Sequence, residues 1–468
     1  MLAACCASGA LAGEPHLTVG DPVYERIDRL AALGLIPSSL PSTRPLSRDA
    51  MAALLAEARE RAGATPDPWI EADLLAIEQR AAMLGVLRDT GVEARIAAGA
   101  RPPVPVGAER AGDRISNGMN TRLGADLGGS LGALLAWGYR PGLRYPMGES
   151  DDLDLVARAA YGTLVGAGLA VTIGRESMWW GPGFRGALLL TDNAAPFDLV
   201  RVETDRPVRL PWVGPLSAHL FVTRLESDRL AIPHPYLAGL RLVIRPWSRL
   251  EFGLSRTAMF GGEGRPVTLD LIWDVIRARG ENSASNPGNQ IAGFDATVRI
   301  PWRAQPVALY VEWAGEDEAN GWPSHPAAVV GAYLPRILGS PRWTLRAEAA
   351  DDALADVPGI WYRHALYRSG YTYKGAVIGH PMGTDARMTS VELTHRVTPD
   401  WSVAALYDGL QRNVYAVDES SGRSLGARIS RDQGTDVAIA EYRYARFEDP
   451  TAPHRSDHLL TVSYRRAW

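Results

Sequence analysis

The chain has 468 residues, with 49 basic and 53 acidic side chains and a formal net charge of −4, so its composition gives no electrostatic reason to expect nucleic-acid binding. It carries 47 glycines and 33 prolines, more than a helical enzyme would contain. Its two cysteines, Cys5 and Cys6, lie at the extreme N-terminus, which excludes a disulfide framework or a cysteine-based metal site in the remaining chain.

The first residues predict export. Residues 1–12 are small and apolar and end in an A-x-A cleavage pattern at 10–12, so we interpret them as the remnant of a signal peptide. Residues 2–5 also resemble a bacterial lipobox, and this alternative would make Cys5 a lipidation site. No uncharged run reaches the roughly 20 apolar residues that a membrane helix needs. The protein is therefore expected to be periplasmic, secreted or an outer-membrane barrel.

Residues 13–90 predict a small helical bundle on the periplasmic side. Asp21-Pro22, Ser47 and Asp67-Pro68 each provide a helix start, and an apolar stripe of helical spacing follows the last of them. That stripe consists of Ile70, Leu74, Ile77, Ala81 and Leu84. We expect three short helices that bury their apolar faces against something larger.

Residues 91–468 change to a period of two, which predicts strands. A soluble sandwich would alternate in the same way, but three further features favour a transmembrane β-barrel. Apolar faces end in tryptophans such as Trp302, Trp313, Trp343 and Trp401, as in aromatic girdles. The chain ends in an alternating segment that finishes with Trp468. Several segments reach the roughly 9–11 residues that a tilted span requires.

Counting back from a periplasmic C-terminus predicts thirteen strands. They lie at 458–468, 435–446, 423–432, 401–417, 387–397, 371–379, 359–368, 342–349, 327–336, 307–314, 291–301, 250–258 and 237–246. About five more strands precede residue 237. Short links then fall at the periplasmic end and the long link 259–290 falls outside, which is how such barrels distribute their loops.

The segment RESMWWGPGFRGALLLTDNAAP, residues 175–196, is the least ordinary stretch of the chain. Tryptophan faces stack on sugar rings and arginine holds uronate carboxylates, so Arg175, Trp179 and Trp180 are candidate polysaccharide-binding residues. The alternative, which we favour, is that Gly-Pro-Gly makes a tight turn while the tryptophans fill the barrel mouth.

This segment resembles the Wzi family of outer-membrane barrels, which attach capsular polysaccharide to the cell surface. The matching residues are Gly174-Arg175, Trp180 to Gly183, Leu188 to Leu190, Asn193 to Pro196 and Trp212 to Leu216, together with the helical opening of the chain. The resemblance implies an eighteen-stranded barrel in the outer membrane with a periplasmic helical bundle. It also implies a lectin rather than an enzyme.

A lectin must meet a polymer that has already left the cell, so we expect its site in the outer loops. The candidate residues are Trp273, Arg277 and Arg279 in the link 259–290, with Trp322 in the next outer loop. Tryptophan supplies a stacking face and arginine a charge-assisted bond to an acidic sugar. The alternative is that 268–278 is a strand or short helix packed over the lumen.

Motifs for catalysis and cofactors are missing from the sequence. It contains no H-E-x-x-H, no P-loop and no G-x-S-x-G, so no catalytic residue, cofactor or metal is expected. Glu176 and Glu312 lie close to tryptophans, as glycosidase carboxylates do, but carboxylates that face the lumen are normal in such barrels.

These observations favour an outer-membrane lectin that attaches or organises capsular or extracellular polysaccharide. The alternatives are a sugar-selective outer-membrane porin and a barrel enzyme that trims polysaccharide or lipid. The expected partners are an acidic polysaccharide and outer-membrane lipid, without nucleic acid, and we expect a monomer.

Overall fold

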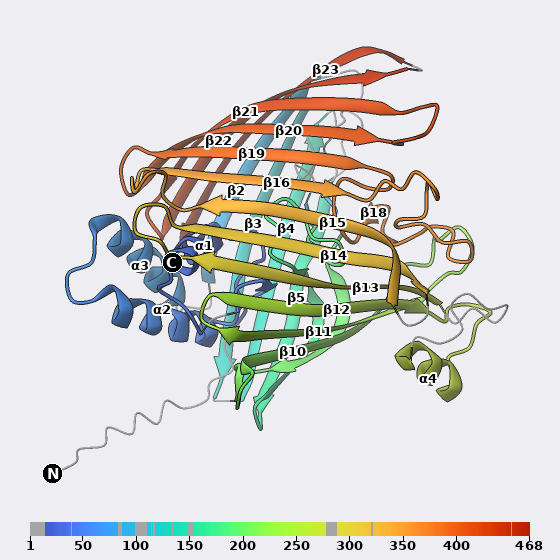
Figure 1. Cartoon of the computed structure of the whole chain (residues 1–468), viewed down its shortest axis with the longest axis horizontal. Coiled ribbons are helices and arrows are strands. Elements are labelled where there is room, and N and C mark those ends of the chain that lie inside the picture. The colour runs from blue at the N-terminus through green and yellow to red at the C-terminus, as the bar shows by residue number, and fades with distance from the viewer. Residues whose placement is uncertain are drawn as a thin grey trace.

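The computed structural model shows a closed β-barrel with three helices at one end and a fourth helix near the other end (Figure 1). It describes residues 15–38, 40–82, 87–98, 110–113, 115, 118–132, 134–147, 153–277, 288–319, 322–450 and 452–468. The expected signal remnant, residues 1–12, and the lipidation candidate Cys5 lie outside these ranges. No helix in the described ranges combines the length and the apolar character that crossing a membrane requires.

Eighteen antiparallel strands form the barrel in the described part of the chain, since β8 (Phe197–Thr204) and β9 (Val208–Leu210) are two pieces of one strand that both pair with β10 (Gly214–Arg224). The first and last strands pair to close it, with Asp89 opposite Ala467. The strands are β2 (Leu87–Ala98), β3 (Gly118–Leu131), β4 (Leu135–Met147), β5 (Asp154–Gly166), β6 (Leu169–Glu176), β8 (Phe197–Thr204), β9 (Val208–Leu210), β10 (Gly214–Arg224), β11 (Tyr236–Trp247), β12 (Leu250–Phe260), β13 (Gly288–Ile300), β14 (Val307–Ala319), β15 (Trp322–Leu334), β16 (Trp343–Asp351), β19 (Arg387–Arg396), β20 (Trp401–Arg412), β21 (Ser420–Asp432), β22 (Asp436–Asp449) and β23 (Ala452–Ala467).

The predicted barrel is confirmed, but two predicted strands are wrong. Residues 359–368 and 371–379 are not in the wall; they belong to a long segment, 352–386, that holds only the two-residue strands β17 (Thr372–Tyr373) and β18 (Ala376–Val377). Their aromatic side chains are buried inside the barrel instead of alternating between lumen and lipid. Seven strands rather than about five precede residue 236, so the two errors cancel in the total.

The two ends of the barrel differ as predicted. Short turns gather at the end with the three helices, where Gly434 lies against Gln79 and Gly34 lies against Pro301. Longer links and the helix α4 (Leu269–Arg277) gather at the opposite end (Figure 1). We name these the helix end and the loop end.

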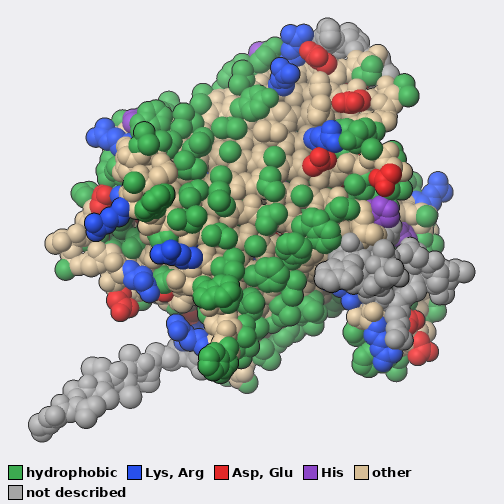
Figure 2. All heavy atoms as spheres, in the orientation of Figure 1, with side chains coloured by type: hydrophobic (Ala, Val, Ile, Leu, Met, Phe, Trp, Pro, Cys, Tyr) green, Lys and Arg blue, Asp and Glu red, His purple; other side chains and the backbone are tan. Residues whose placement is uncertain are grey.

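The outward face of the barrel is an apolar belt. Strand residues alternate between buried polar side chains in the lumen and exposed apolar side chains outside, as Glu251, Ser255 and Leu254 do along β12. Figure 2 shows hydrophobic side chains across the middle of the wall, with charged ones mostly toward the two ends. This distribution fits lipid around the barrel waist.

Exposed tryptophans form a girdle at the helix end. They stand at the ends of strands or in the turns between them, and the residues are Trp212, Trp247, Trp302, Trp343, Trp401 and Trp468. Three of the four girdle residues expected from the sequence are among them. The fourth, Trp313, lies farther along β14 and stacks on Phe294 at 5.5 Å.

The N-terminal helices are α1 (Val23–Ala32), α2 (Arg48–Ala62) and α3 (Pro68–Ala81). Ser47 and Asp67 cap α2 and α3 by accepting hydrogen bonds from backbone N–H groups, as the sequence predicted. The expectation that their apolar stripes need a larger partner is only partly right. The stripes mainly bury one another in a core of their own, which contains Ile27, Met51 and Leu74, while Ala32 packs on the barrel wall.

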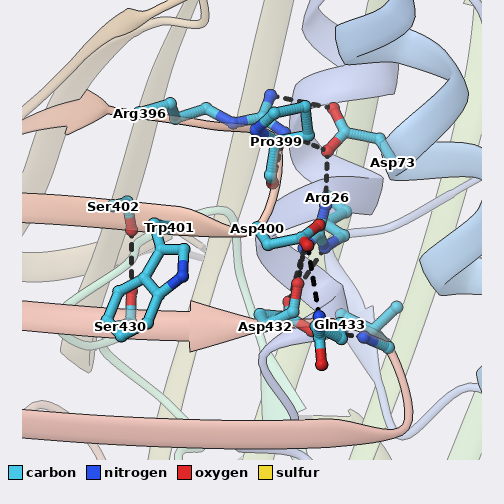
Figure 3. Close-up of polar contacts among 12 residues, drawn as sticks. Arg26, Asp73, Arg396, Pro399, Asp400, Trp401, Ser402, Ser430, Asp432 and Gln433 are labelled. Carbon is cyan, nitrogen blue, oxygen red and sulfur yellow. Dashed lines mark hydrogen bonds and ion pairs between the residues drawn. The ribbon is translucent and has the colours of Figure 1, made fainter.

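The helices instead dock on the barrel through buried charges. Arg26 of α1 donates from Nη1 to Asp73 of α3 at 2.8 Å and from Nε to Asp432, the last residue of β21, at 2.9 Å. Arg396, at the end of β19, donates to the same Asp73 (Figure 3). Burial alone would raise the pKa of Asp73, but the charges of Arg29, Arg396 and Arg26 outweigh it and hold that pKa below its usual range.

Candidate functional site

The tryptophan-containing segment 177–196 folds into the lumen. Its strand β7 (Trp179–Trp180) pairs with β1 (Thr43–Arg44), which precedes α2, so the segment contacts the N-terminal region as well as the wall. Two wall carboxylates hold it by accepting backbone hydrogen bonds. Glu348 accepts from the N–H groups of Phe184 at 2.8 Å and Arg185 at 3.1 Å, and Glu312 accepts from that of Leu188 at 2.8 Å.

The Gly-Pro-Gly turn requires its glycines. Gly181 has φ +139°, a conformation that side chains disfavour. A Cβ atom on Gly183 would lie 2.0 Å from the carbonyl oxygen of Gly186, which is backbone and cannot move aside. The turn brings the N–H groups of residues 184 and 185 to one carboxylate, so this part of the motif is explained by the fold.

Trp179 and Trp180 are both only 2 % exposed. Trp180 packs edge-on against Phe221 at 5.3 Å, and Trp179 lies beside Val19 and Ala187. Neither ring offers a face to a polymer outside the cell. The packing role favoured from the sequence agrees with this burial.

A second segment, residues 352–386, packs on the first. Tyr362 donates its hydroxyl to the carbonyl of Leu188 at 2.7 Å, and Tyr371 donates to the carbonyl of Leu189 at 2.9 Å. At its base Asp352 accepts from the N–H of Ala386 at 2.6 Å, and burial raises the pKa of this carboxyl well above its usual range. We call the two segments together, residues 177–196 and 352–386, the plug.

The loop-end surface of the plug carries a shallow hollow of about 410 Å³. Its lining residues are Gly359, Ile360, Arg363, His364, Ala365 and Arg368. Arg363 and Arg368 are exposed, and neither forms an ion pair with any carboxylate among the described residues. The hollow thus presents two guanidinium groups over a partly apolar floor.

The backbone of the hollow is held in place from below. His364 accepts at Nδ1 from the N–H groups of Leu366 and Tyr367, each at 3.2 Å. The hydroxyl of Tyr367 donates to the carbonyl of Gly261 at 3.0 Å, just beyond β12. A rigid support of this kind keeps the entropy cost of binding low.

Of the outer-loop residues expected from the sequence, two are described as neighbours. Trp273 and Arg277 are neighbours on α4, with the guanidinium 5.4 Å from the ring centre. Arg279 lies outside the described residues, and nothing of the side chain of Trp322 is described beyond its place at the start of β15. Arg175 pairs with Asp198 at 2.6 Å through neighbouring strands.

Sequence reasoning missed Arg363, His364 and Arg368 because it placed them in a wall strand. A signal was present in the segment WYRHALYRSGYTYK, where aromatic residues cluster without a regular period of two. Such clustering is unusual in a strand that alternates between lipid and lumen.

The lumen carboxylates considered for glycosidase chemistry are engaged in structural contacts. Glu176 accepts from His16 at 3.0 Å and pairs with Arg201 at 3.0 Å, while Glu312 holds the plug. Across the described residues, no three His, Cys, Asp or Glu side chains are grouped so that they could hold a metal ion.

Comparison with known proteins agrees with this architecture. A family model described as capsule assembly protein Wzi matches residues 105–460. The solved structure of Wzi from Escherichia coli, described as a carbohydrate-binding β-barrel involved in group 1 capsule assembly, superposes with a TM-score of 0.76. The alignment covers 97 % of this chain and 100 % of that one at 23 % identity, so this likeness concerns the fold.

A relative from Klebsiella pneumoniae is an uncharacterized 55.8 kDa protein in the cps region. It is 34 % identical over 194 residues, which is 40 % of this chain. The matched part spans only 37 % of that relative's own length.

Proposed function

Because this chain belongs to the Wzi family of capsule assembly proteins, we propose that it is an outer-membrane lectin that holds capsular or extracellular polysaccharide at the cell surface. The observation that carries the proposal is the hollow on the loop-end face of the plug. There the exposed Arg363 and Arg368, which form no ion pair with a described carboxylate, lie beside the buried and hydrogen-bonded Tyr367.

The chemistry of the hollow suits an acidic sugar. The planar guanidinium forks of Arg363 and Arg368 match the geometry of a uronate carboxylate. Ile360 and Ala365 between them offer apolar contact to the C–H face of a sugar ring. We therefore propose that the polymer binds here rather than on α4, whose Val275 packs against Ala258 and Phe260 of the barrel wall.

We propose that the protein acts without catalysis. The buried carboxylates of the lumen that lie nearest the plug hold its backbone, as Glu312, Glu316 and Glu348 do. A glycosidase would need two carboxyl groups free to approach one bond from opposite sides. The contacts of these three residues support a scaffolding role instead.

The porin alternative predicts an open lumen. Here the plug occupies the lumen and the three helices dock at the helix end of the barrel, which favours a binding protein over a channel. A monomer surrounded by outer-membrane lipid is part of the same proposal. Recording from a planar bilayer separates the two functions, because a porin conducts ions steadily and a plugged lectin does not.

The test in cells compares two arginine variants. Changing Arg363 and Arg368 together to Ala should release polysaccharide into the medium while leaving barrel assembly intact. The matched control is Arg303→Ala, which removes an exposed arginine from the helix end. If the double variant and the control retain equal amounts of surface polysaccharide, the hollow is not the binding site.

A further inference from the structure

The helix α4 lies outside the barrel wall rather than over the lumen. Its buried residue Val275 packs with Leu271 against Ala258 and Phe260 of β12. These β12 residues alternate with the lumen-facing Thr257 and Met259, so they belong to the outward face. The alternative that residues 268–278 form a short helix packed over the lumen is therefore right about the helix and wrong about its location, since α4 lies at the loop end outside the wall (Figure 1).

The helix has three sectors around its axis. At about 100° per residue, Leu271 and Val275 fall together on the side that meets the barrel. A second sector is apolar yet exposed: Leu269 is 76 % exposed, Trp273 53 % and Ile276 57 %, with the exposed Ile272 at its edge toward Val275. The third sector is charged and contains Asp270, Asp274 and Arg277.

An arginine of the barrel wall fixes the end of α4. Arg256, on the outward face of β12, donates to the carbonyl of Ile276 at 2.8 Å and to that of Val275, and it also bonds Gln290 of β13. These contacts satisfy carbonyl groups that a helix C-terminus leaves open. They hold α4 in one orientation, so its exposed apolar sector is a fixed surface.

The distance from the tryptophan girdle to α4, measured along the barrel axis, matches the thickness of the apolar part of an outer membrane. Trp247 of the girdle is opposite Leu250, and ten residues of β12 separate Leu250 from Phe260 under α4. Ten residues rise about 33 Å along a strand, or about 25 Å along the barrel axis at a tilt near 40°. An outer-membrane barrel has an apolar band of about 25 Å.

We propose that α4 is an interfacial helix that inserts its exposed apolar sector, Leu269, Ile272, Trp273 and Ile276, into the outer leaflet at the boundary between acyl chains and headgroups. The occupant is lipid because α4 packs through Leu271 and Val275 on the outward face of β12, the same face on which Leu254 is exposed in the apolar belt. The charged sector then faces water, as in other interfacial helices.

This inference stands independently of the proposed function. It reassigns Trp273 from sugar stacking to membrane anchoring, where tryptophan is favoured because its ring is apolar and its N–H is polar. The two roles predict different accessibility to water. If the apolar sector of α4 contacts lipid, it is shielded from water in vesicles that contain no polysaccharide. If it contacts sugar, it is shielded only when polysaccharide is present.

The test measures depth with nitroxide labels on single cysteines. In a chain with Cys5 and Cys6 changed to Ser, Ile272→Cys, Ile276→Cys and Asp274→Cys are labelled, with Leu254→Cys as the lipid-facing reference. The proteins are reconstituted into phosphatidylcholine–phosphatidylglycerol vesicles without polysaccharide. Collision rates with dissolved oxygen and with a water-soluble nickel complex are then compared.

The proposal predicts an oxygen-to-nickel collision ratio several-fold higher at residues 272 and 276 than at residue 274, approaching that of residue 254. Equal ratios at the three positions of α4 would overturn it. So would shielding of residues 272 and 276 from nickel that arises only when polysaccharide is added, because that outcome assigns the sector to sugar.

Discussion

Asp73 of α3 accepts a hydrogen bond at 3.1 Å from Nη2 of Arg396, which ends strand β19 and so joins the helical bundle to the barrel wall. The same carboxylate also pairs with Arg26 and Arg29 of α1 and is only 1 % exposed. One buried charge thus links two helices and a barrel turn (Figure 3).

Changing Asp73 to Asn should undock the bundle. Removing one partner from a buried ion pair costs about 3–5 kcal/mol, since it leaves the opposite charges buried without compensation. Hydrogen exchange in α1 and α3 should become much faster while exchange in the barrel strands stays slow. The control is Glu78→Gln on the same helix, whose exposed pair with Arg59 contributes at most about 1 kcal/mol. Equal exchange in both variants would contradict the role of Asp73.

Acid should weaken the same contact. The pKa of Asp73 is lower in the folded protein than the value of about 3.9 that aspartate has in an unfolded chain. A depressed carboxyl pKa gives stability that is complete above the unfolded value and is lost as the pH falls through the folded one. The protection factors of α1 and α3, which compare exchange with the intrinsic rate at each pH, should therefore be constant down to about pH 4 and fall below it. Asp73→Asn should remove most of this acid dependence, and an unchanged profile would count against the assignment.

Gly183→Ala should prevent the plug from forming. The added Cβ would meet the carbonyl oxygen of Gly186 at 2.0 Å, so the turn that binds Glu348 cannot close. Limited proteolysis should then cut within residues 177–196. Gly166→Ala is the control, because its Cβ would meet nothing within 4 Å. Protection equal to that of the control would show that the turn tolerates a side chain.

Trp180→Ala should lower the amount of folded barrel. Deleting a large aromatic side chain from a packed core costs about 3–5 kcal/mol. The fraction that runs fast on a gel without heating, as compact barrels do, should fall. Trp302→Ala removes an exposed girdle ring and should affect that fraction less. A normal folded fraction combined with reduced polysaccharide retention would instead favour the sugar-binding role of Trp180.

The barrel could be predicted because its physical signature is local. Polar residues that face the lumen alternate with exposed apolar residues along each strand. Capping residues such as Ser47 and Asp67 mark where helices begin. The plug could not be predicted in the same way. The aromatic side chains of residues 359–379 are buried in the plug, while Arg363, Ala365 and Arg368 are exposed, and the order of buried and exposed residues follows no regular period.

The candidate site depends on contacts that sequence spacing does not reveal. Arg363 and Arg368 become a pair only because Tyr362, Tyr367 and Tyr371 fix the segment from below. The tryptophan motif was found from its composition, and its role as packing was the favoured interpretation. The sequence did not reveal which segment packs on that motif. That segment, residues 352–386, lies more than 150 residues farther along the chain.

Direct binding of the purified protein to polysaccharide tests the central claim most closely. The probe is the acidic polysaccharide isolated from the same cells, and its carboxyl-reduced form is the matched neutral control. The wild-type protein in detergent should bind the acidic polymer, and replacing Arg363 and Arg368 by Ala should weaken binding about tenfold, which corresponds to about 1.4 kcal/mol. The carboxyl-reduced polymer should bind both proteins weakly. If the wild-type protein binds neither polymer, or if the double variant binds the acidic polymer as tightly as wild type, the assignment of the hollow as a polysaccharide site is contradicted.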